Sequence, residues 1–289
     1  MRRSRRPDTE GHGLMANVRA VYEKPLRTLD DLGAELAFFL RALAWTPKTI
    51  VRYKKEILRV LAEITLGSGA LAVIGGTVGV ITAMCFFTGT EVGLQGYAAL
   101  NQIGTAAFSG FVSAYFNTRE IAPLVAGIAL AATVGCGFTA QLGAMRISEE
   151  VDALEVMAVP SLPFLVSTRI VGGMLAIIPL YVVGLVSSYF ATRLTVTRFF
   201  GQSTGTYDYY FHTFLPPQDV LWSFGKVLVF AVTVILIHCY YGYNATGGPA
   251  GVGVAVGKAV RTSIVAINVI DLFLSMAIWG ATTTVRLAG

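Results

Sequence analysis

Long uncharged runs alternate with short polar segments along most of this 289-residue chain. Residues 64–90, 121–145, 170–192 and 227–257 contain no Asp, Glu, Lys or Arg. Each run exceeds the roughly 20 apolar residues that cross a hydrocarbon core about 30 Å thick. Because lipid offers no hydrogen bonds to the backbone, such runs predict helices. The pattern therefore predicts an all-α, polytopic membrane protein.

Five transmembrane helices are expected, near residues 67–89, 118–143, 165–191, 222–243 and 263–285. Residues 90–117 hold several amides and glycines, and we assign them to an external or re-entrant segment, with a sixth crossing as the alternative. The assignment rests on parity. If the basic N-terminal region and the acidic segment at residues 146–157 are both cytoplasmic, an even number of crossings must separate them. The span near 67–89 supplies one crossing, so residues 90–145 should supply one more. Residues 193–221 would then form an external loop, and residues 244–262 a glycine-rich cytoplasmic loop.

Amphipathic helices are expected before the first span, over residues 28–66. Apolar residues recur there at helical spacing, at Leu36, Phe39, Leu40 and Leu43 and again at Ile57, Leu58, Leu61 and Ile64. Pro47 is expected to break the pattern between the two helices. Cations interleave with the second set, which favours helices lying in the membrane interface over helices packed on a cytosolic partner. Residues 1–27 are expected to form a basic, disordered cytoplasmic arm.

Composition supports a membrane protein. Only 13% of the residues are charged and the mean hydropathy is +0.64, whereas about 25% are charged in soluble domains. Residues 1–66 hold 13 basic and 8 acidic residues, so the positive-inside rule places the N-terminus in the cytoplasm, and five crossings place the C-terminus in the periplasm. The basic arm lacks the interleaved aromatic residues of a nucleic-acid binder, so anionic headgroups are the expected partners. Three scattered cysteines predict neither disulfides nor a metal site.

An acidic segment at residues 146–157 separates two of the apolar runs. Four carboxylates, Glu149, Glu150, Asp152 and Glu155, lie within seven residues, and Arg146 is the only basic residue near them. We expect a helix over 148–158 with Ser148 as its N-cap, an apolar face through Val151 and Leu154, and a stop at Pro160. Such a helix can dock on a soluble nucleotide-hydrolysing subunit. The alternative is an acidic solvated loop.

Three further ionisable residues, Arg119, Glu120 and Asp271, fall inside or at the start of predicted spans. Charges at membrane depth are costly and are often functional, although pairing with a neighbouring helix is the favoured interpretation here. No residue qualifies as catalytic. The run GVGVAVGKA at residues 251–259 departs from the phosphate-binding G-x-x-x-x-G-K-[ST] pattern at its first and last positions, so the chain is expected to bind no nucleotide itself.

The runs REIAP at residues 119–123 and GAMRISEEVDALEVM at residues 143–157 resemble the MlaE/YrbE family of ABC transporter permeases. Two further runs are similar to that family, RYKKEIL at residues 52–58 and YGYNATGGPAGVG at residues 241–253. The resemblance covers about residues 45–285. The basic N-terminal extension makes the chain similar in particular to YrbE-type permeases of mycobacterial Mce lipid importers.

The resemblance implies a permease subunit of a lipid transporter in the inner membrane, importing fatty acids or related lipids. Its implied partners are a cytoplasmic ATPase dimer that binds ATP and Mg²⁺, a second permease and external MCE-domain lipid-binding proteins. Arg146, Glu149, Glu150, Asp152 and Glu155 would contact the ATPase. The family's usual Glu-Gln pair reads Glu149-Glu150 here, which suggests a paralogous second permease and a heterodimer. A non-transporting scaffold for an envelope complex is the alternative.

Overall fold

The computed structural model describes residues 32–66 and 76–280, and within these ranges all regular secondary structure is helical. Five helical segments are long and apolar enough to cross a membrane: Thr77–Gln102, Ala106–Ile147, Pro163–Phe199, Pro217–Tyr243 and Gly248–Trp279. The predicted all-α polytopic fold with five spans is therefore confirmed.

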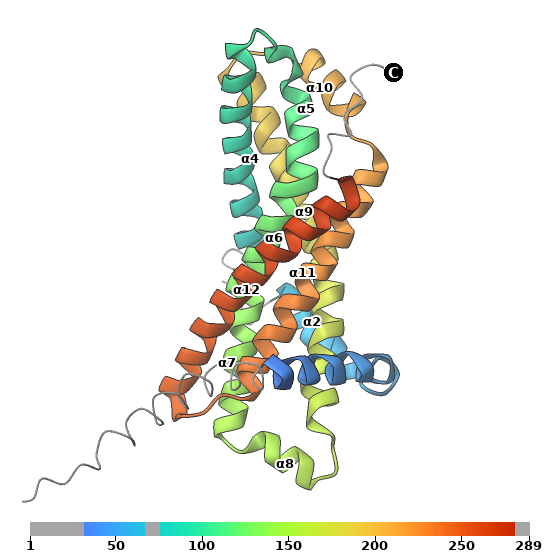
Figure 1. Ribbon diagram of the computed structural model, residues 1–289, viewed down its shortest axis with the longest axis vertical. Coiled ribbons are helices and arrows are strands. Elements are labelled where there is room, and N and C mark those ends of the chain that lie inside the picture. Colours follow the sequence, from blue (N-terminus) through green and yellow to red (C-terminus); the bar gives the residue numbers. More distant parts are fainter. Residues whose placement is uncertain (1–31, 67–75, 281–289) are drawn as a thin grey trace, which may run out of the picture.

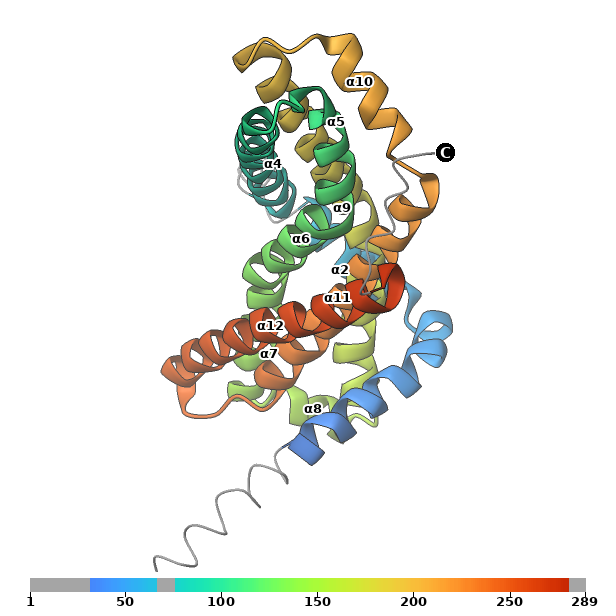
Figure 2. The same cartoon turned by 45° about the horizontal axis from the view of Figure 1, so that its top comes forward.

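The spans run roughly along the long axis of the molecule, and α12 crosses the others obliquely (Figure 1). They contain α4 (Thr77–Gln102), α5 (Ser109–Val112), α6 (Ala122–Leu130), α7 (Cys136–Ile147), α9 (Thr168–Leu194), α11 (Pro217–Tyr243) and α12 (Gly248–Trp279). Short helices mark the two ends of the bundle. We call them the α8 end, after α8 (Glu150–Val156), and the α10 end, after α10 (Thr204–Thr213). Figure 2 shows α10 lying across the tops of the spans.

The expected external or re-entrant segment at 90–117 is wrong. The first span continues through this stretch to Gln102, and after a short turn the second span begins at Ala106. Gln95 donates a hydrogen bond to Glu91 at 2.9 Å within α4, so these polar side chains satisfy one another and the helix does not end. Residues 67–75, the start of the predicted first span, lie outside the described residues.

Both other predicted loops are shorter than expected. The third span continues to Phe199, and α10 occupies much of the predicted external loop at 193–221. The predicted cytoplasmic loop at 244–262 is reduced to residues 244–247, because α12 already begins at Gly248. Glycines predict loops in soluble proteins, but in lipid they serve helix packing and are tolerated inside spans. Residues 281–289 lie outside the described residues.

Helices α4 and α9 pack closely because small residues line their contact. A Cβ atom added to Gly89 would meet the backbone of Ser188, and one added to Gly184 would meet Ile81 and Cys85. The Thr192 hydroxyl donates a hydrogen bond across this contact to the Gly89 carbonyl at 2.7 Å. Close backbone approach of this kind drives helix association in membranes, where the hydrophobic effect contributes little.

The N-terminal helices differ from each other in placement. The helix over residues 32–52 lies across the α8 end rather than along the spans (Figures 1 and 2). Helix α2 (Lys54–Leu66) packs its buried residues Ile57, Val60 and Ile64 on the bundle, where α9 is its main neighbour. The expected break at Pro47 is wrong, since the chain leaves helical geometry at Tyr53. Pro47 is exposed and removes only one backbone hydrogen bond from the helix.

We predict that Gly89→Ala destabilises the bundle, because the new methyl group would lie 2.9 Å from the Ser188 Cα atom and would force α4 away from α9. Overpacking of this kind costs about 1–3 kcal/mol. Thermal unfolding in detergent should show a lower Tm. Gly137→Ala is the matched control, since its Cβ would meet nothing within 4 Å. Equal Tm values for the two variants would contradict the close α4–α9 contact.

Candidate functional site

Helix α8 projects from the α8 end of the bundle, beyond the helix over residues 32–52 (Figure 1). It joins the second span to the third and is held to the core by Val151, which is fully buried, and by the partly buried Leu154. The expected docking segment is therefore a short helix anchored on one face. Arg146 belongs to α7 rather than to α8, and it forms an ion pair with Asp152 at 2.6 Å.

The predicted N-cap, Ser148, is wrong. Ser148 ends α7 and donates its hydroxyl to the Ala144 carbonyl at 3.0 Å. Glu149 takes the N-cap position of α8 with φ of 60°, in the left-handed region. Because a cap in this conformation makes a sharp turn, α8 starts two residues later than the predicted boundary at 148.

The other end of α8 also turns through a left-handed residue. Ala158 has φ of 58°, and the Val159 and Ala158 amides donate to the carbonyls of Leu154 and Glu155. This pair of hydrogen bonds is a Schellman motif, which usually places glycine at the left-handed position. Pro160 follows and prevents further helix, as predicted. Two strained turns thus fix the direction of α8 without a glycine.

The outer surface of α8 combines carboxylates with apolar side chains. Glu149, Glu150, Asp152 and Glu155 are all exposed. Val156 and Met157 follow them, with 88% and 64% of their surface exposed. Exposed apolar side chains beside a charged rim are typical of protein interfaces. Sequence reasoning assigned the carboxylates and missed this apolar pair, although the outward face of the predicted helix could have identified it.

A cluster of charges lies inside the bundle around Lys226, whose side chain is completely buried. Its ammonium group is 2.8 Å from Asp271 and 3.2 Å from Glu120, and it donates to the Arg119 carbonyl at 2.6 Å. Ser275 accepts from Lys226 at 2.8 Å and donates to Glu120 at 2.8 Å. The second span, α11 and α12 each contribute to this cluster.

The cluster continues toward the α10 end through a second ion pair. The Arg119 guanidinium lies 2.7 Å from Asp219 and stacks on Tyr115 and Trp279. The Trp279 indole donates to the other oxygen of Asp219 at 3.0 Å. With all five groups ionised, two positive charges face three negative ones. Buried ion pairs of this kind cost desolvation energy and are retained where each partner is satisfied.

The structure thus brings Arg119, Glu120 and Asp271 together, and each pairs with a neighbouring helix, which was the favoured interpretation from the sequence. Glu120 pairs with Lys226 on α11, and Arg119 pairs with Asp219. Lys226 and Asp219 were missed, although a single lysine within an apolar run is itself the signal that intramembrane charges give. Lys226 lies nine residues into α11, about 14 Å along the helix from its start.

Arg119 and Glu120 lie on a π-helical stretch of the second span, Ser113–Ile121. In this geometry hydrogen bonds reach one residue further than in an α-helix, which is frequent at functional sites. In the widened turn the Arg119 carbonyl accepts a hydrogen bond from the Lys226 ammonium group, while the Arg119 side chain donates to Asp219. Local backbone geometry therefore helps to assemble the cluster.

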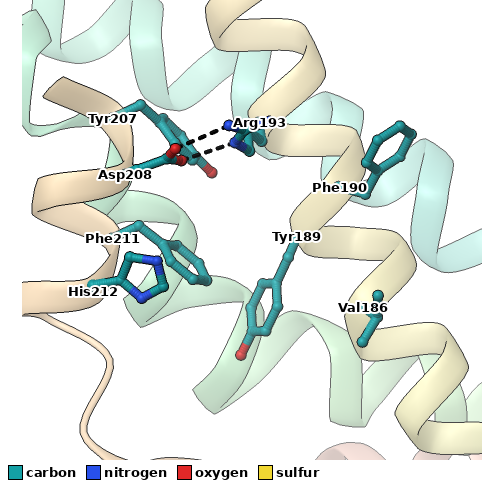
Figure 3. A pocket seen from close by; sticks show the side chains of 8 residues that line it. All are labelled: Val186, Tyr189, Phe190, Arg193, Tyr207, Asp208, Phe211 and His212. Atoms are coloured by element: carbon teal, nitrogen blue, oxygen red, sulfur yellow. Dashed lines mark hydrogen bonds and ion pairs between the residues drawn. The ribbon is translucent and has the colours of Figure 1, made fainter. Parts of the chain in front are cut away.

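A cavity of about 370 Å³ lies between α9 and α10 near the α10 end (Figure 3). Tyr189, Tyr207 and Phe211 form its aromatic walls, and Arg193 donates two hydrogen bonds to Asp208 at its rim, at 2.8 and 2.9 Å. These bonds hold the pKa of the Asp208 carboxyl below its usual value. They also tie α10 to the end of the third span.

The described residues contain no group of three His, Cys, Asp or Glu side chains that could hold a metal ion. Residues 251–259, with their superficial likeness to a phosphate loop, form part of the continuous helix α12. The geometry therefore offers two sites of interest, the exposed acidic helix α8 at one end and a charged cluster within the spans.

Comparison with known proteins agrees with this geometry. The family model described as Permease MlaE matches residues 67–277. A "Probable ABC transporter permease protein" of Rickettsia bellii is 29% identical over 196 residues, covering 68% of this chain and 76% of the relative. The intermembrane phospholipid transport system permease protein MlaE of Haemophilus influenzae is 26% identical, over 68% and 75% of the two chains.

A plant relative is also similar. The chloroplastic protein TRIGALACTOSYLDIACYLGLYCEROL 1 of Arabidopsis thaliana is 30% identical over 200 residues. The match covers 66% of this chain and spans only 56% of the plant protein.

We predict that Lys226→Met lowers the free energy of unfolding by about 2–3 kcal/mol, because it leaves the partly buried carboxylates of Glu120 and Asp271 without their counter-charge. Adding Glu120→Gln and Asp271→Asn should restore most of the loss. Unfolding in detergent would measure both effects. Lys258→Met, on the exposed side of α12, is the control and should change little. If Lys226→Met left the free energy of unfolding unchanged, the cluster would not stabilise the fold.

Proposed function

Because this chain belongs to the Permease MlaE family, we propose that it is the membrane-spanning subunit of a lipid transporter driven by ATP that a separate subunit hydrolyses. The observation that carries the proposal is α8, an acidic helix with an exposed apolar tip that is anchored to the bundle by Val151. A transporter whose energy comes from another chain needs such a contact. ATP and Mg²⁺ would bind to the partner, and this chain would hold no cofactor and catalyse no reaction.

In this proposal α8 enters a groove of the ATPase, with Val156 and Met157 as the apolar anchor. Glu149, Glu150 and Glu155 would pair with cations at the rim of that groove, and Arg146 would keep Asp152 in place. Closure of the ATPase pair would push on α8. The two left-handed turns make α8 a stiff connection, so the push would reach α7 and the third span.

We propose that the movement of α8 is transmitted through the second span to the charged cluster inside the bundle. Lys226, Glu120 and Asp271 connect the second span, α11 and α12, so a shift of the second span changes their mutual distances. Glu120 has 37% of its side chain exposed at the surface of this single chain. A carboxylate left facing hydrocarbon is costly, and a second permease packed there would cover it.

We propose phospholipids or fatty acids as the transported class and import as the direction. The name of the Haemophilus relative, which specifies intermembrane phospholipid transport, supports a lipid substrate. The narrower likeness to mycobacterial Mce importers, drawn from the basic N-terminal extension, supports fatty acids and external MCE-domain partners. The inner membrane is the proposed location, with a cytoplasmic N-terminus and a periplasmic C-terminus. Nucleic acid has no part in the proposal.

We predict that Glu149→Lys combined with Asp152→Lys weakens ATPase association at least tenfold without removing the protein from the membrane, because both changes reverse charge on the docking surface. Co-purification with the ATPase measures the effect. Lys258→Glu with Arg261→Glu is the control, since it reverses two charges at exposed positions on α12, outside the docking surface. Normal co-purification and transport by the charge-reversal variant would remove α8 from the proposed interface.

A second prediction concerns orientation. A cysteine placed after Gly289 should react with an impermeant thiol reagent in cells with a permeabilised outer layer, and a cysteine before Met1 should not. Of the native thiols, Cys85 and Cys239 are buried and Cys136 is partly exposed, so Cys136→Ala is included in both tagged variants. Labelling that appears only after the inner membrane is lysed would reverse the proposed placement of the C-terminus.

A third prediction concerns composition of the transporter. The purified chain alone should hydrolyse no ATP, and the intact complex should contain one copy of this chain with one paralogous permease. Mass measurement of the complex decides the second point. Two copies of this chain without a paralogue would exclude the heterodimer and leave the transporter proposal intact.

A further inference from the structure

The helix over residues 32–52 marks the membrane surface at the α8 end. It lies across the spans rather than along them (Figure 1), and large apolar side chains are exposed on it. These are Leu32, Leu36, Leu40, Leu43, Trp45, Ile50 and Val51. An amphipathic helix in this position buries its apolar face at the boundary between headgroups and acyl chains. The C-terminal end of the helix is therefore at headgroup level.

Two cavities lie where this helix ends, and both are lined by Arg52 and Tyr53. The smaller, about 150 Å³, is lined by Trp45, Lys48 and Arg52 together with Pro160 and Pro163. The larger, about 410 Å³, is lined by Arg52, Lys54, Lys55 and Phe164 among others. Tyr53 lines both cavities and packs edge-on against Phe164, with ring centroids 5.4 Å apart. We call both cavities together the Tyr53 site.

The Tyr53 site carries a concentrated positive charge. Its four cations, Lys48, Arg52, Lys54 and Lys55, form no ion pair among the described residues. Glu56 also lines the larger cavity, but its carboxylate lies 3.8 Å from Arg59 outside the site. Four cations around one acidic group leave an excess of positive charge, which a bound anion would neutralise.

We propose that the Tyr53 site binds the phosphate of an anionic lipid headgroup. Lysine and arginine donors suit phosphate oxygens, and tryptophan and tyrosine rings are enriched at headgroup level. Basic residues beside a membrane surface each add to the affinity for anionic lipid. The acidic helix α8 carries the opposite charge and would repel the same ligand. Under the proposed function, α8 contacts the ATPase and the Tyr53 site contacts the lipid headgroup.

The lipid at this site would be a stably bound component rather than transported cargo. The site is at the outer edge of the α8 end, and the charged cluster around Lys226 lies on the other helices α11 and α12 and the second span. The bound headgroup would lie between the helix over 32–52 and residues 160–164, the stretch that leads from α8 into the third span. It would therefore brace the connection on which α8 depends.

The test measures lipid retention by the full-length chain in detergent, with native mass spectrometry as the readout. Dioleoylphosphatidylglycerol is the anionic probe, dioleoylphosphatidylcholine the zwitterionic one, and inorganic phosphate the soluble anion. We expect the anionic lipid to be retained preferentially. Lys48→Gln with Arg52→Gln should weaken its binding roughly tenfold. The charge-preserving exchange Lys48→Arg with Arg52→Lys should bind as the unaltered chain does, which separates charge from misfolding.

The matched control is Lys258→Gln with Arg261→Gln, which removes the same charge from exposed positions on α12. An equal loss in this control would show nonspecific attraction and overturn the site. Equal retention of both lipids would exclude headgroup charge as the determinant. Displacement of the lipid by millimolar phosphate would identify a soluble anion as the ligand instead. None of these outcomes depends on ATP hydrolysis or transport, so the proposed function stands or fails separately.

Discussion

Lys226 holds its positive charge where water cannot reach it, and this constraint determines how the helices around it are arranged. An unpaired ammonium group in such surroundings would cost several kcal/mol. Asp271 on α12 and Glu120 on the second span must therefore lie against α11 at one height. The π-helical stretch that contains Glu120 widens the second span at this level. Apolar packing alone could slide by a helical turn, whereas paired charges fix the register of three spans.

Most of the fold could be predicted from hydropathy, because the cost of burying charge in lipid is large compared with local preferences. The class of fold followed from the uncharged runs, and the number of spans followed from these runs together with the parity of crossings and a fifth apolar stretch around Asp271. The boundaries of the spans could not be predicted in this way. Glycines before Lys258 resembled a loop, yet they lie in α12, and the amides near Gln95 resembled a re-entrant segment, yet they lie in α4. Gln95 donates a hydrogen bond to Glu91 within α4, and Gly253 and Gly257 of α12 face open space rather than a turn. Neither fact is visible in a single sequence.

The candidate site residues, like the fold, could be predicted only in part from the sequence. The four carboxylates of the α8 segment could be assigned because local sequence concentrates them on one short helix. The cluster around Lys226 could be suspected residue by residue, but its pairing could not be predicted, since Glu120 and Lys226 are 106 positions apart. The obvious neighbour, Arg119, turned out to pair with Asp219. Contacts between distant segments depend on how the helices rotate about their axes, which hydropathy leaves free.

The left-handed turn at Glu149 has a consequence for engineering. Glycine adopts this conformation without steric strain, whereas other residues incur a penalty on the order of 1 kcal/mol. The chain thus holds a carboxylate where stability alone favours glycine, and under the proposed function this residue makes the docking surface more acidic at the expense of a weaker fold. Such trade-offs are common where stability and activity make different demands. Replacing this one residue with glycine would relieve the strain and, under the proposed function, weaken the contact with the ATPase, which is a combination suited to isolating the membrane subunit by itself.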